Sequence, residues 1–414
     1  MSKNKVVELD SLEDIADPLT ELLRSGAQQL IHKAVEAELQ GFLAQFSGQV
    51  TEDGHAKVVR NGYQPERQLQ TGIGPVTVKV PKVRSRTGEA VTFRSALVPP
   101  YVRKTQSLEA ALPWLYLKGV STGEMEEALK VLVGPQAEGL SASTVARLKQ
   151  AWAEEYQQWR NQSLHDEWVY LWADGIYSGL RSSEDKLCSL VVIGVNSRGE
   201  KHFLAIEDGV RESTQSWREV LLNLKSRGLN TAKLAVGDGA MGFWAALDEV
   251  YPGTRHQRCW LHKTRNVLNA LPKRTQAKAK EALHDIWQAE TREDAEKSFD
   301  LFIKTYEAKY PKASNCLQKD REELLAFYDF PAQHWQSLRT TNPIESTFGT
   351  IRHRTKRSKG CLTRSGMLQM MFKLGMCAEK KWRKLRGFNY LAKVITGIQF
   401  KDGIEVLEEN RDVA

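Results

Sequence analysis

The sequence predicts a mixed α/β protein in which a mainly helical amino-terminal region with a small β element precedes an α/β core. Two observations predict this class. Between residues 167 and 260, short aromatic and β-branched runs alternate with helical patterns in the order β, β, β, α, β, α, β. In residues 9–46, apolar residues instead recur at spacings of three and four, and residues 107–153 and the Ala-, Lys-, Glu- and Leu-rich residues 262–330 are also predicted to be helical.

The composition is that of a folded chain without a membrane span. The 414 residues are 41% hydrophobic and 27% charged, which excludes a mostly disordered chain, a collagen-like repeat and a disulfide-rich secreted scaffold. No apolar run approaches the roughly 18 residues of a membrane span. The five cysteines are an odd number and thinly spread, and no apolar signal-peptide core precedes residue 18. We therefore expect free thiols in a bacterial cytoplasm.

The amino-terminal elements follow from local patterns. The helix expected over residues 9–46 ends at Ser47-Gly48. Val76, Val78 and Val80 then alternate with polar residues, and the flanking glycines and prolines limit this pattern to a short strand. We assign residues 1–110 to one region of helices with a small β element.

Residues 107–153 contain two helical patterns, each preceded by residues that can cap a helix. Ser and Thr at 121–122 can cap the first helix, and serines at 141 and 143 can cap the second. Two short capped helices joined by a glycine-bearing turn are typical of a helix-turn-helix, although an ordinary helical hairpin has the same pattern. We assign residues 111–160 to this helix-turn-helix-like region.

The pattern changes to that of an α/β domain at Glu167. Strands are expected at 167–174, 186–196, 201–208, 232–239 and 254–260, and helices at 213–227 and 242–250. Three antiparallel strands followed by α/β crossovers is the element order of a ribonuclease H-like fold. Residues 263–330 are predicted to form an all-α insertion in this domain, which we place at residues 161–400 with a tail at 401–414.

Positive charge is concentrated in two blocks. The chain has 59 Lys and Arg against 51 Asp and Glu, a net charge of +8. Residues 339–386 hold thirteen basic and two acidic residues, and residues 55–105 hold ten basic and two acidic residues, so the rest of the chain is acidic. Two defined basic blocks indicate contact with a polyanion such as nucleic acid, although two solvated faces would have the same composition.

Three acidic residues are candidates for a catalytic metal site. Asp174 and Asp238 each end a predicted strand and precede a glycine, and Glu345 lies near the start of a helix expected over residues 342–357. Strand ends are where α/β sheets bind ligands. Three carboxylates at one corner would repel one another unless cations lie between them, and oxygen ligands suit Mg²⁺ or Mn²⁺. Two turn aspartates and a helix-capping glutamate are the structural alternative.

A basic run with almost no interleaved acidic residue follows Glu345. It consists of Arg352, Arg354, Lys356, Arg357 and Lys359. DNA that passes a metal site needs such neutralisation of its phosphates, so we expect this run to bind DNA. A solvated helix face, or pairing with Glu322 and Glu323, is the alternative.

Several segments resemble the Mutator-type transposases of bacterial insertion sequences. They are LWADGIYSGLR, AVGDGAMGFWAAL, QRCWLHKTRNVL, FYDFPAQHWQSLRTTNPIESTFGTIRHRTKRSKG and the earlier TGIGPVTVKVPKVR. The resemblance covers about residues 20–400, and its most specific part runs from NPIES to RTKRSKG. It implies a ribonuclease H-like DDE transposase with Asp174, Asp238 and Glu345 as the acidic triad. Such an enzyme uses Mg²⁺ or Mn²⁺, and we expect two ions.

The resemblance also bears on a Cys-His pair and one tryptophan. Cys259 and His262 match the C-x-x-H signature of that family, for which we expect a structural or DNA-end-positioning role. With His256 they could also contribute to a zinc site, but no second pair with metal spacing follows. Trp335 resembles a family tryptophan that manages flanking or flipped bases, with a core position as the alternative. Trp244 is expected in the core.

The resemblance implies a transposase that binds terminal inverted repeats through its amino-terminal half. It would hydrolyse a phosphodiester at the element end, and the freed 3′-hydroxyl would attack target DNA. Because two ends are processed together, we expect a homodimer or larger assembly on double-stranded DNA, associated with the bacterial nucleoid and not with a membrane. Two alternatives stay open: a nuclease of the same fold that cuts without joining, and a DNA-binding regulator descended from such an enzyme.

Overall fold

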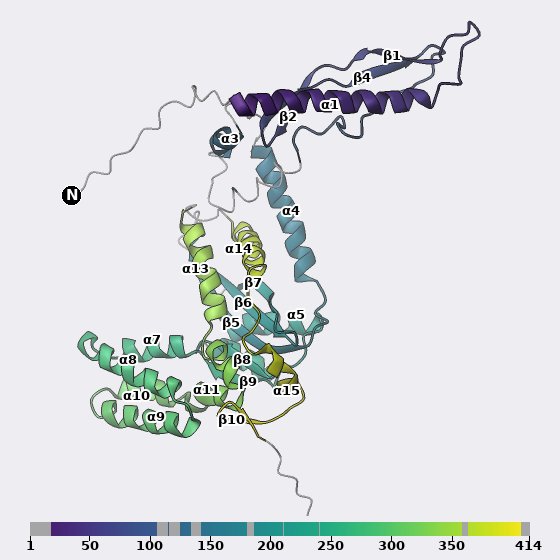
Figure 1. Cartoon of the computed structure of the whole chain (residues 1–414). Helices are drawn as coiled ribbons and strands as arrows, with labels where there is room; N and C mark the ends of the chain where they lie inside the picture. Colours follow the sequence, from purple (N-terminus) through teal and green to yellow (C-terminus); the bar gives the residue numbers. More distant parts are fainter. Residues whose placement is uncertain are drawn as a thin grey trace, which may run out of the picture. The chain divides into compact units, whose positions relative to one another are not determined.

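The structure is a computed structural model in which the chain divides into two compact units, residues 1–148 and residues 149–414 (Figure 1). The structure describes residues 18–105, 115, 125–133, 142–179, 186–209, 211–239, 241–357 and 363–406. The division falls within helix α4 (Ala142–Arg160), between the domain limits at 110 and 160 that the sequence suggests. The two units are described separately below.

The described part of the first unit is built around one long helix and four short strands. They are α1 (Pro18–Ala44), β1 (Val58–Tyr63), β2 (Arg67–Thr71), β3 (Gly74–Val78) and β4 (Pro81–Ser85). β1 pairs with β4 and β2 pairs with β3, both antiparallel. Val35 and Leu39 of α1 are buried together with Val76 and Val78 of β3. The predicted helix and strand are confirmed here, with residues 9–17 outside the described part.

Two helices represent the helix-turn-helix-like region. α3 (Met125–Val133) and the start of α4 lie where the two capped helices are expected. The segments before and between them, residues 116–124 and 134–141, lie outside the described residues. The helix-turn-helix therefore stays a prediction.

The second unit contains a five-stranded sheet in the order β7-β6-β5-β8-β9. Its elements are β5 (Trp168–Gly179), β6 (Lys186–Asn196), β7 (Lys201–Gly209), α5 (Thr214–Ser226), β8 (Leu234–Gly237), α6 (Met241–Val250) and β9 (Arg255–Arg258). β5, β6 and β7 pair antiparallel, whereas β8 and β9 continue the sheet parallel to β5. The predicted order of strands and helices is found along this part of the chain.

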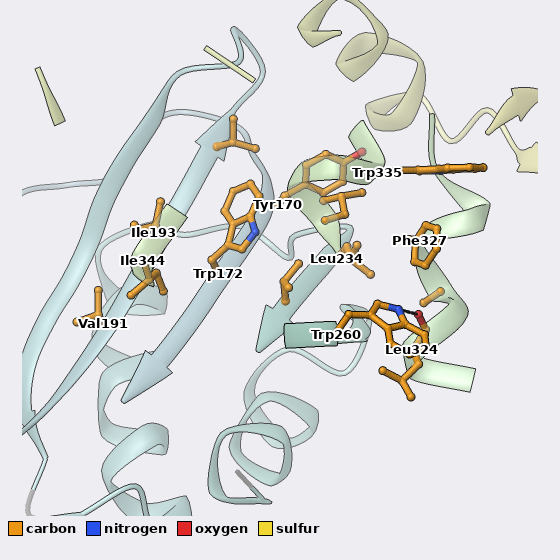
Figure 2. Close-up of a cluster of buried hydrophobic side chains, with 14 of the residues drawn as sticks. Tyr170, Trp172, Val191, Ile193, Leu234, Trp260, Leu324, Phe327, Trp335 and Ile344 are labelled. Atoms are coloured by element: carbon orange, nitrogen blue, oxygen red, sulfur yellow. Dashed lines mark hydrogen bonds between the residues drawn. The ribbon is translucent and has the colours of Figure 1, made fainter. Parts of the chain in front are cut away.

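Both faces of the sheet are buried. Along β5, Leu171 and Ala173 belong to the apolar cluster that α5 and α6 complete. Tyr170 and Trp172 point to the other face and join a larger cluster with Ile344 of a later helix (Figure 2). Because neighbouring strand residues point to opposite faces, a strand covered on both sides is apolar at nearly every position. This explains the continuous run WVYLWA.

Helices surround the second face and one end of the sheet. They are α7 (Trp260–Asn269), α8 (Lys273–Gln288), α9 (Arg292–Tyr306), α10 (Pro311–Gln318), α11 (Arg321–Leu325), α12 (Trp335–Leu338), α13 (Asn342–Arg357), α14 (Arg364–Glu379) and α15 (Leu391–Ile395), with 3-10 turns at Ala326–Asp329, Ala332–His334 and Phe388–Tyr390. The helices predicted over residues 263–330 are found in the segment from α7 to α11, and Figure 1 shows α7, α8, α9 and α10 grouped together. Trp260 links the start of α7 to α11, because its Nε1 donates to the Leu324 carbonyl at 2.8 Å (Figure 2).

The expected tail begins with ordered structure. β10 (Phe400–Lys401) and β11 (Ile404–Glu405) form a hairpin. The Gly403 N–H donates to the Tyr328 carbonyl, and the Gly403 carbonyl accepts from Ala332, both at 3.1 Å. The second unit therefore extends past residue 401.

Among the helices of the described residues, none combines the length and the apolar character of a membrane-spanning segment.

Candidate active site

Asp174 and Asp238 occupy equivalent positions in two neighbouring parallel strands. The last paired residues of β5 and β8 are Ala173 and Gly237, so each aspartate comes directly after the end of this pairing. Asp238 follows its strand, as predicted. The prediction that Asp174 ends its strand is wrong, because β5 continues to Gly179 along its other neighbour, β6.

Glu345 lies in the first turn of α13, the helix that begins at Asn342 as predicted. Ile344 and Phe348 are fully buried in the core. Because they are four residues apart, they place one face of the helix against the sheet. The N–H of Glu345 donates to the Thr341 carbonyl at 3.0 Å, which closes the first turn of the helix.

Asp174, His262 and Glu345 form a compact group. One ligand atom from each residue lies within 4.8 Å of the others. The Nε2 atom of His262 lies 3.2 Å from a carboxylate oxygen of Glu345. Two of the three predicted acidic residues thus meet, although they come from a strand and a helix far apart in the sequence. Asp238 is not in this group, but its charge acts on both Asp174 and His262.

Two carboxyl groups near this site, those of Asp174 and Glu212, have raised pKa values. Burial raises the pKa of Asp174 to about 7, His262 opposes this rise, and the charges of Asp238, Glu212 and Glu345 add to it. Burial and the charge of Asp238 also raise the pKa of Glu212. A buried carboxyl among other carboxylates keeps its proton until a positive charge compensates. The repulsion between these carboxyl groups is the electrostatic condition that a bound cation relieves.

Glu212 is a fourth acidic residue, and sequence analysis did not identify it. A Cβ atom on Gly175 would lie 2.2 Å from the Glu212 carboxyl carbon, and one on Gly242 would lie 2.6 Å from the Glu212 carbonyl oxygen. The two glycines therefore make room for Glu212 beside Asp174. Gly175 is a β5 residue paired with Leu190 and does not lie in a turn. No local sequence pattern indicates this packing.

Cys259 and His262 hold the start of α13. Cys259 is buried at the beginning of α7, and its sulfur accepts hydrogen bonds from the Thr341 N–H at 3.3 Å and hydroxyl at 3.4 Å. His262 lies one turn further along α7, where Nδ1 is 3.5 Å from the Thr341 hydroxyl and Nε2 faces Glu345. The first turn of α7 thus contacts both the residue before α13 and the acidic residue in its first turn.

These contacts disfavour a zinc site. Burial opposes a charged imidazole at His262, but the hydrogen bond with Cys259 and the charges of Asp174 and Asp238 raise the pKa of His262 to about 9. A metal-binding imidazole must be neutral, so the raised pKa of His262 disfavours it as a zinc ligand. His256, the third potential ligand, is paired through Nε2 with an Asp248 carboxylate oxygen at 2.9 Å.

The backbone carbonyl of Asp238 accepts two side-chain hydrogen bonds. The Nε1 atom of Trp244 donates at 2.7 Å and an Nη atom of Arg258 donates at 3.2 Å. The Arg258 guanidinium also lies 4.4 Å from the centre of the Trp244 ring. The predicted core position of Trp244 is confirmed, since it is 4% exposed. The hydrogen bond from its Nε1 also holds the loop that carries Asp238 in place.

Trp335 also lies in the core, so the expectation that it contacts DNA bases is wrong. Its side chain is 8% exposed, and its Nε1 donates to the Phe330 carbonyl at 2.8 Å. The ring packs edge-on against Phe327 (Figure 2), and the Arg339 guanidinium lies 5.2 Å from its centre. A base can stack only on an exposed ring. The core alternative therefore holds.

The basic run lies at the end of α13 and beyond it. Four of its residues are on the helix: Arg352, Arg354, Lys356 and Arg357. Their side chains, and Lys359 as a whole, lie outside the described residues, so their contact with DNA stays a prediction. Of the two acidic residues in the alternative, Glu322 is paired with Arg292 at 2.5 Å.

The donor set fits a hard divalent cation. Asp174 and Glu345 offer carboxylate oxygens from a sheet and a packed helix, and Asp238 lies at the adjacent position in the sheet. Mg²⁺ and Mn²⁺ prefer carboxylate and water oxygens, whereas structural zinc sites use Cys and His. The raised pKa of Asp174 is the expected property of a site that gathers negative charge.

Comparison with known proteins identifies the family. Residues 1–384 match the family described as Transposase, Mutator family. The transposase for insertion sequence element IST2 of Acidithiobacillus ferrooxidans is 51% identical over 282 residues, which cover 68% of this chain and 95% of that protein. The transposase for IS6120 of Mycolicibacterium smegmatis is 44% identical over 307 residues, covering 74% and 94%. The chain therefore belongs to the Mutator family of transposases, as its sequence motifs predict.

Proposed function

We propose that this chain is a DDE transposase that binds the terminal inverted repeats of an insertion sequence, cleaves DNA strands at the element ends and joins them to target DNA. The observation that carries the proposal is the meeting of Asp174 and Glu345 beside the loop of Asp238. Membership of a transposase family supports it. We also propose that the core is a ribonuclease H-like domain, which the sheet order β7-β6-β5-β8-β9 supports.

The proposed reaction has two steps, and in each step an oxygen nucleophile attacks a phosphorus atom of DNA. In the first step, water attacks a phosphodiester at the element end, and the 3′ oxygen leaves and takes up a proton to become a hydroxyl. In the second step, this hydroxyl loses its proton as its oxygen attacks a phosphodiester of the target, and the 3′ oxygen of the target leaves and takes up a proton. One phosphodiester forms as another breaks, so the joining step needs neither an energy source nor a covalent protein–DNA intermediate.

Asp174, Asp238 and Glu345 would hold Mg²⁺ or Mn²⁺, with two ions expected. Such ions, when bound, activate the attacking oxygen and stabilise charge on the leaving oxygen. The chain itself fixes the three carboxylates. The β5 ladder holds Asp174, two side-chain donors hold the Asp238 carbonyl, and contacts from α7 to Thr341 hold the start of the helix that carries Glu345.

The remaining parts of the chain would bring DNA to this site. We propose that residues 1–150 bind the inverted repeats and that the basic run at 352–359 neutralises phosphates near Glu345. A homodimer or larger assembly would hold two element ends and target DNA together. Such an enzyme would act in the bacterial cytoplasm, in association with the nucleoid.

Substitutions that keep side-chain size but remove one anionic oxygen test the triad. Asp174→Asn, Asp238→Asn and Glu345→Gln should each abolish Mg²⁺-dependent cleavage of an inverted-repeat duplex while DNA binding stays largely intact. Glu219→Gln, on an exposed position of α5, is the matched control and should cleave like the wild type. A triad variant that cleaves at a near wild-type rate would exclude that residue from the triad.

A pre-cut element end separates this proposal from its alternatives. A transposase joins the free 3′-hydroxyl of such an end to target DNA when Mg²⁺ is added. A nuclease of the same fold would cut the uncut duplex but leave the pre-cut end unjoined. A DNA-binding regulator would bind the inverted repeat and neither cut nor join it.

A further inference from the structure

The β1–β4 ribbon carries three exposed basic side chains along β4 and at its end. They are Lys82, Arg84 and Arg86, which we call the β4 stripe. Because strand residues alternate between faces, Lys82 and Arg84 share one face, and Arg86 follows directly after the strand. The pairing with β1 extends to the last of them, since the Arg86 N–H donates to the Lys57 carbonyl at 2.9 Å.

The opposite face of the ribbon is anchored to the first unit. Val83 packs against the buried cluster of this unit, and Arg60, its partner across the ribbon, is paired with Glu36 of α1 at 2.7 Å. Figure 1 shows β1 and β4 running alongside α1. The β4 stripe therefore faces away from α1, on a ribbon whose other side is held in place.

The β4 stripe differs from neighbouring basic residues in lacking acidic partners. Lys57 is paired with Glu89 at 3.0 Å, and Lys79 is paired with Glu66. Within the part of the chain that the structure describes, no carboxylate pairs with a stripe residue. Exposed cations without acidic partners on a fixed scaffold favour a polyanionic partner.

We infer that the β4 stripe binds the phosphate backbone of double-stranded DNA. Successive stripe residues recur about every 6.8 Å along the strand, and one DNA strand advances roughly 3.4 Å per phosphate along the duplex axis. The spacing of the stripe residues therefore corresponds to every second phosphate of one DNA strand. A two-stranded ribbon is also an element that fits a DNA groove. Lysine and arginine at phosphates position the protein without reading sequence. The inference rests on the proposed action on DNA and places one contact outside the helix-turn-helix-like region.

The salt dependence of DNA binding by the full-length protein tests this inference. The variant Lys82→Ala, Arg84→Ala, Arg86→Ala should bind a labelled random-sequence duplex with a shallower slope of log affinity against log salt. Each lost phosphate contact changes the slope by about 0.9, so three contacts give about 2.7. Between roughly 50 and 200 mM salt, the wild type should then lose about 40-fold more affinity than the variant. An inverted-repeat duplex should show the same change.

Two further variants control for net charge and for folding. Lys57→Ala, Lys79→Ala, Lys297→Ala removes the same charge from positions that are paired with carboxylates and should change the slope by less than about one unit. The variant Lys82→Arg, Arg84→Lys, Arg86→Lys keeps the charge and should keep the wild-type slope.

Two outcomes would overturn the inference while the proposed function stands. The first is wild-type DNA binding with an unchanged slope in the alanine stripe variant. The second is an equal fall in slope in the charge-matched control, which would show that only net charge matters. A wild-type protein that binds neither duplex would instead contradict the proposed function itself.

Discussion

Asp174→Asn should make the metal-free protein more stable even though it should abolish DNA cleavage. Burial raises the pKa of this carboxyl from 3.8 to about 7 in the folded protein. Above neutral pH, Asp174 is charged in the folded protein. Its buried carboxylate is then less favourable than the same carboxylate exposed to water in the unfolded chain. Asparagine has nearly the same shape and carries no charge, so it removes this cost.

The size of the effect follows from the pKa shift. A group whose pKa is raised on folding stabilises the protein below its unfolded pKa, and this stability is lost as pH rises through the folded pKa. The shift corresponds to on the order of 4 kcal/mol at about 1.36 kcal/mol per pKa unit. The variant should match the wild type near pH 4 and exceed its free energy of unfolding above pH 7. Between about pH 5.5 and 7, the difference should grow by about 2 kcal/mol.

Urea unfolding in EDTA, followed by tryptophan fluorescence, measures this difference. Ten of the eleven tryptophans lie in residues 149–414, so the signal reports on the unit that contains the site. Adding Mg²⁺ should then stabilise the wild type more than Asp174→Asn, because a ligand stabilises the state that binds it. Glu219→Gln is exposed and should stay within about 0.5 kcal/mol of the wild type at each pH.

The reasoning is refuted if Asp174→Asn is no more stable than the wild type at pH 8 in EDTA. A difference that does not change with pH would also refute it, since packing rather than ionisation would then be responsible. Equal stabilisation of both proteins by Mg²⁺ would show that Asp174 does not hold the metal.

Three more predictions concern Gly242, Gly175 and His334. Gly242→Ala should lower the free energy of unfolding by about 1–3 kcal/mol, because its Cβ would meet backbone atoms. In Gly175→Ala, the new Cβ atom would meet the flexible Glu212 side chain, which can move away. This variant should therefore lose DNA cleavage while its melting temperature stays near that of the wild type. A fall in melting temperature as large as that of Gly242→Ala would contradict this prediction. Burial lowers the pKa of His334, whose ring hydrogen bonds with Tyr170, so wild-type stability should fall as pH drops below 6.5. In His334→Asn, the free energy of unfolding measured in urea should fall less below pH 6.5 than in the wild type. The same pH dependence in both proteins would contradict this prediction.

Local patterns in the sequence were sufficient to predict the elements of the core. The strands at 186–196 and 201–209 and the helix at 342–357 lie where these patterns place them. Such patterns depend on residues a few positions apart, so they can be recognised before packing is known. The family could also be predicted, because its motifs are contiguous segments such as NPIES.

Only the tertiary structure decided which side chains meet and which are buried. An Asp-Gly pair has the same local pattern in a turn as in the middle of β5, where the partner strand β6 continues past Asp174. Glu212 reaches Gly175, and Cys259 bonds to Thr341, through contacts between segments far apart in the chain. Trp335 is buried because helices from several parts of the chain pack around it. Burial and contact are properties of that packing, and no short segment determines them alone.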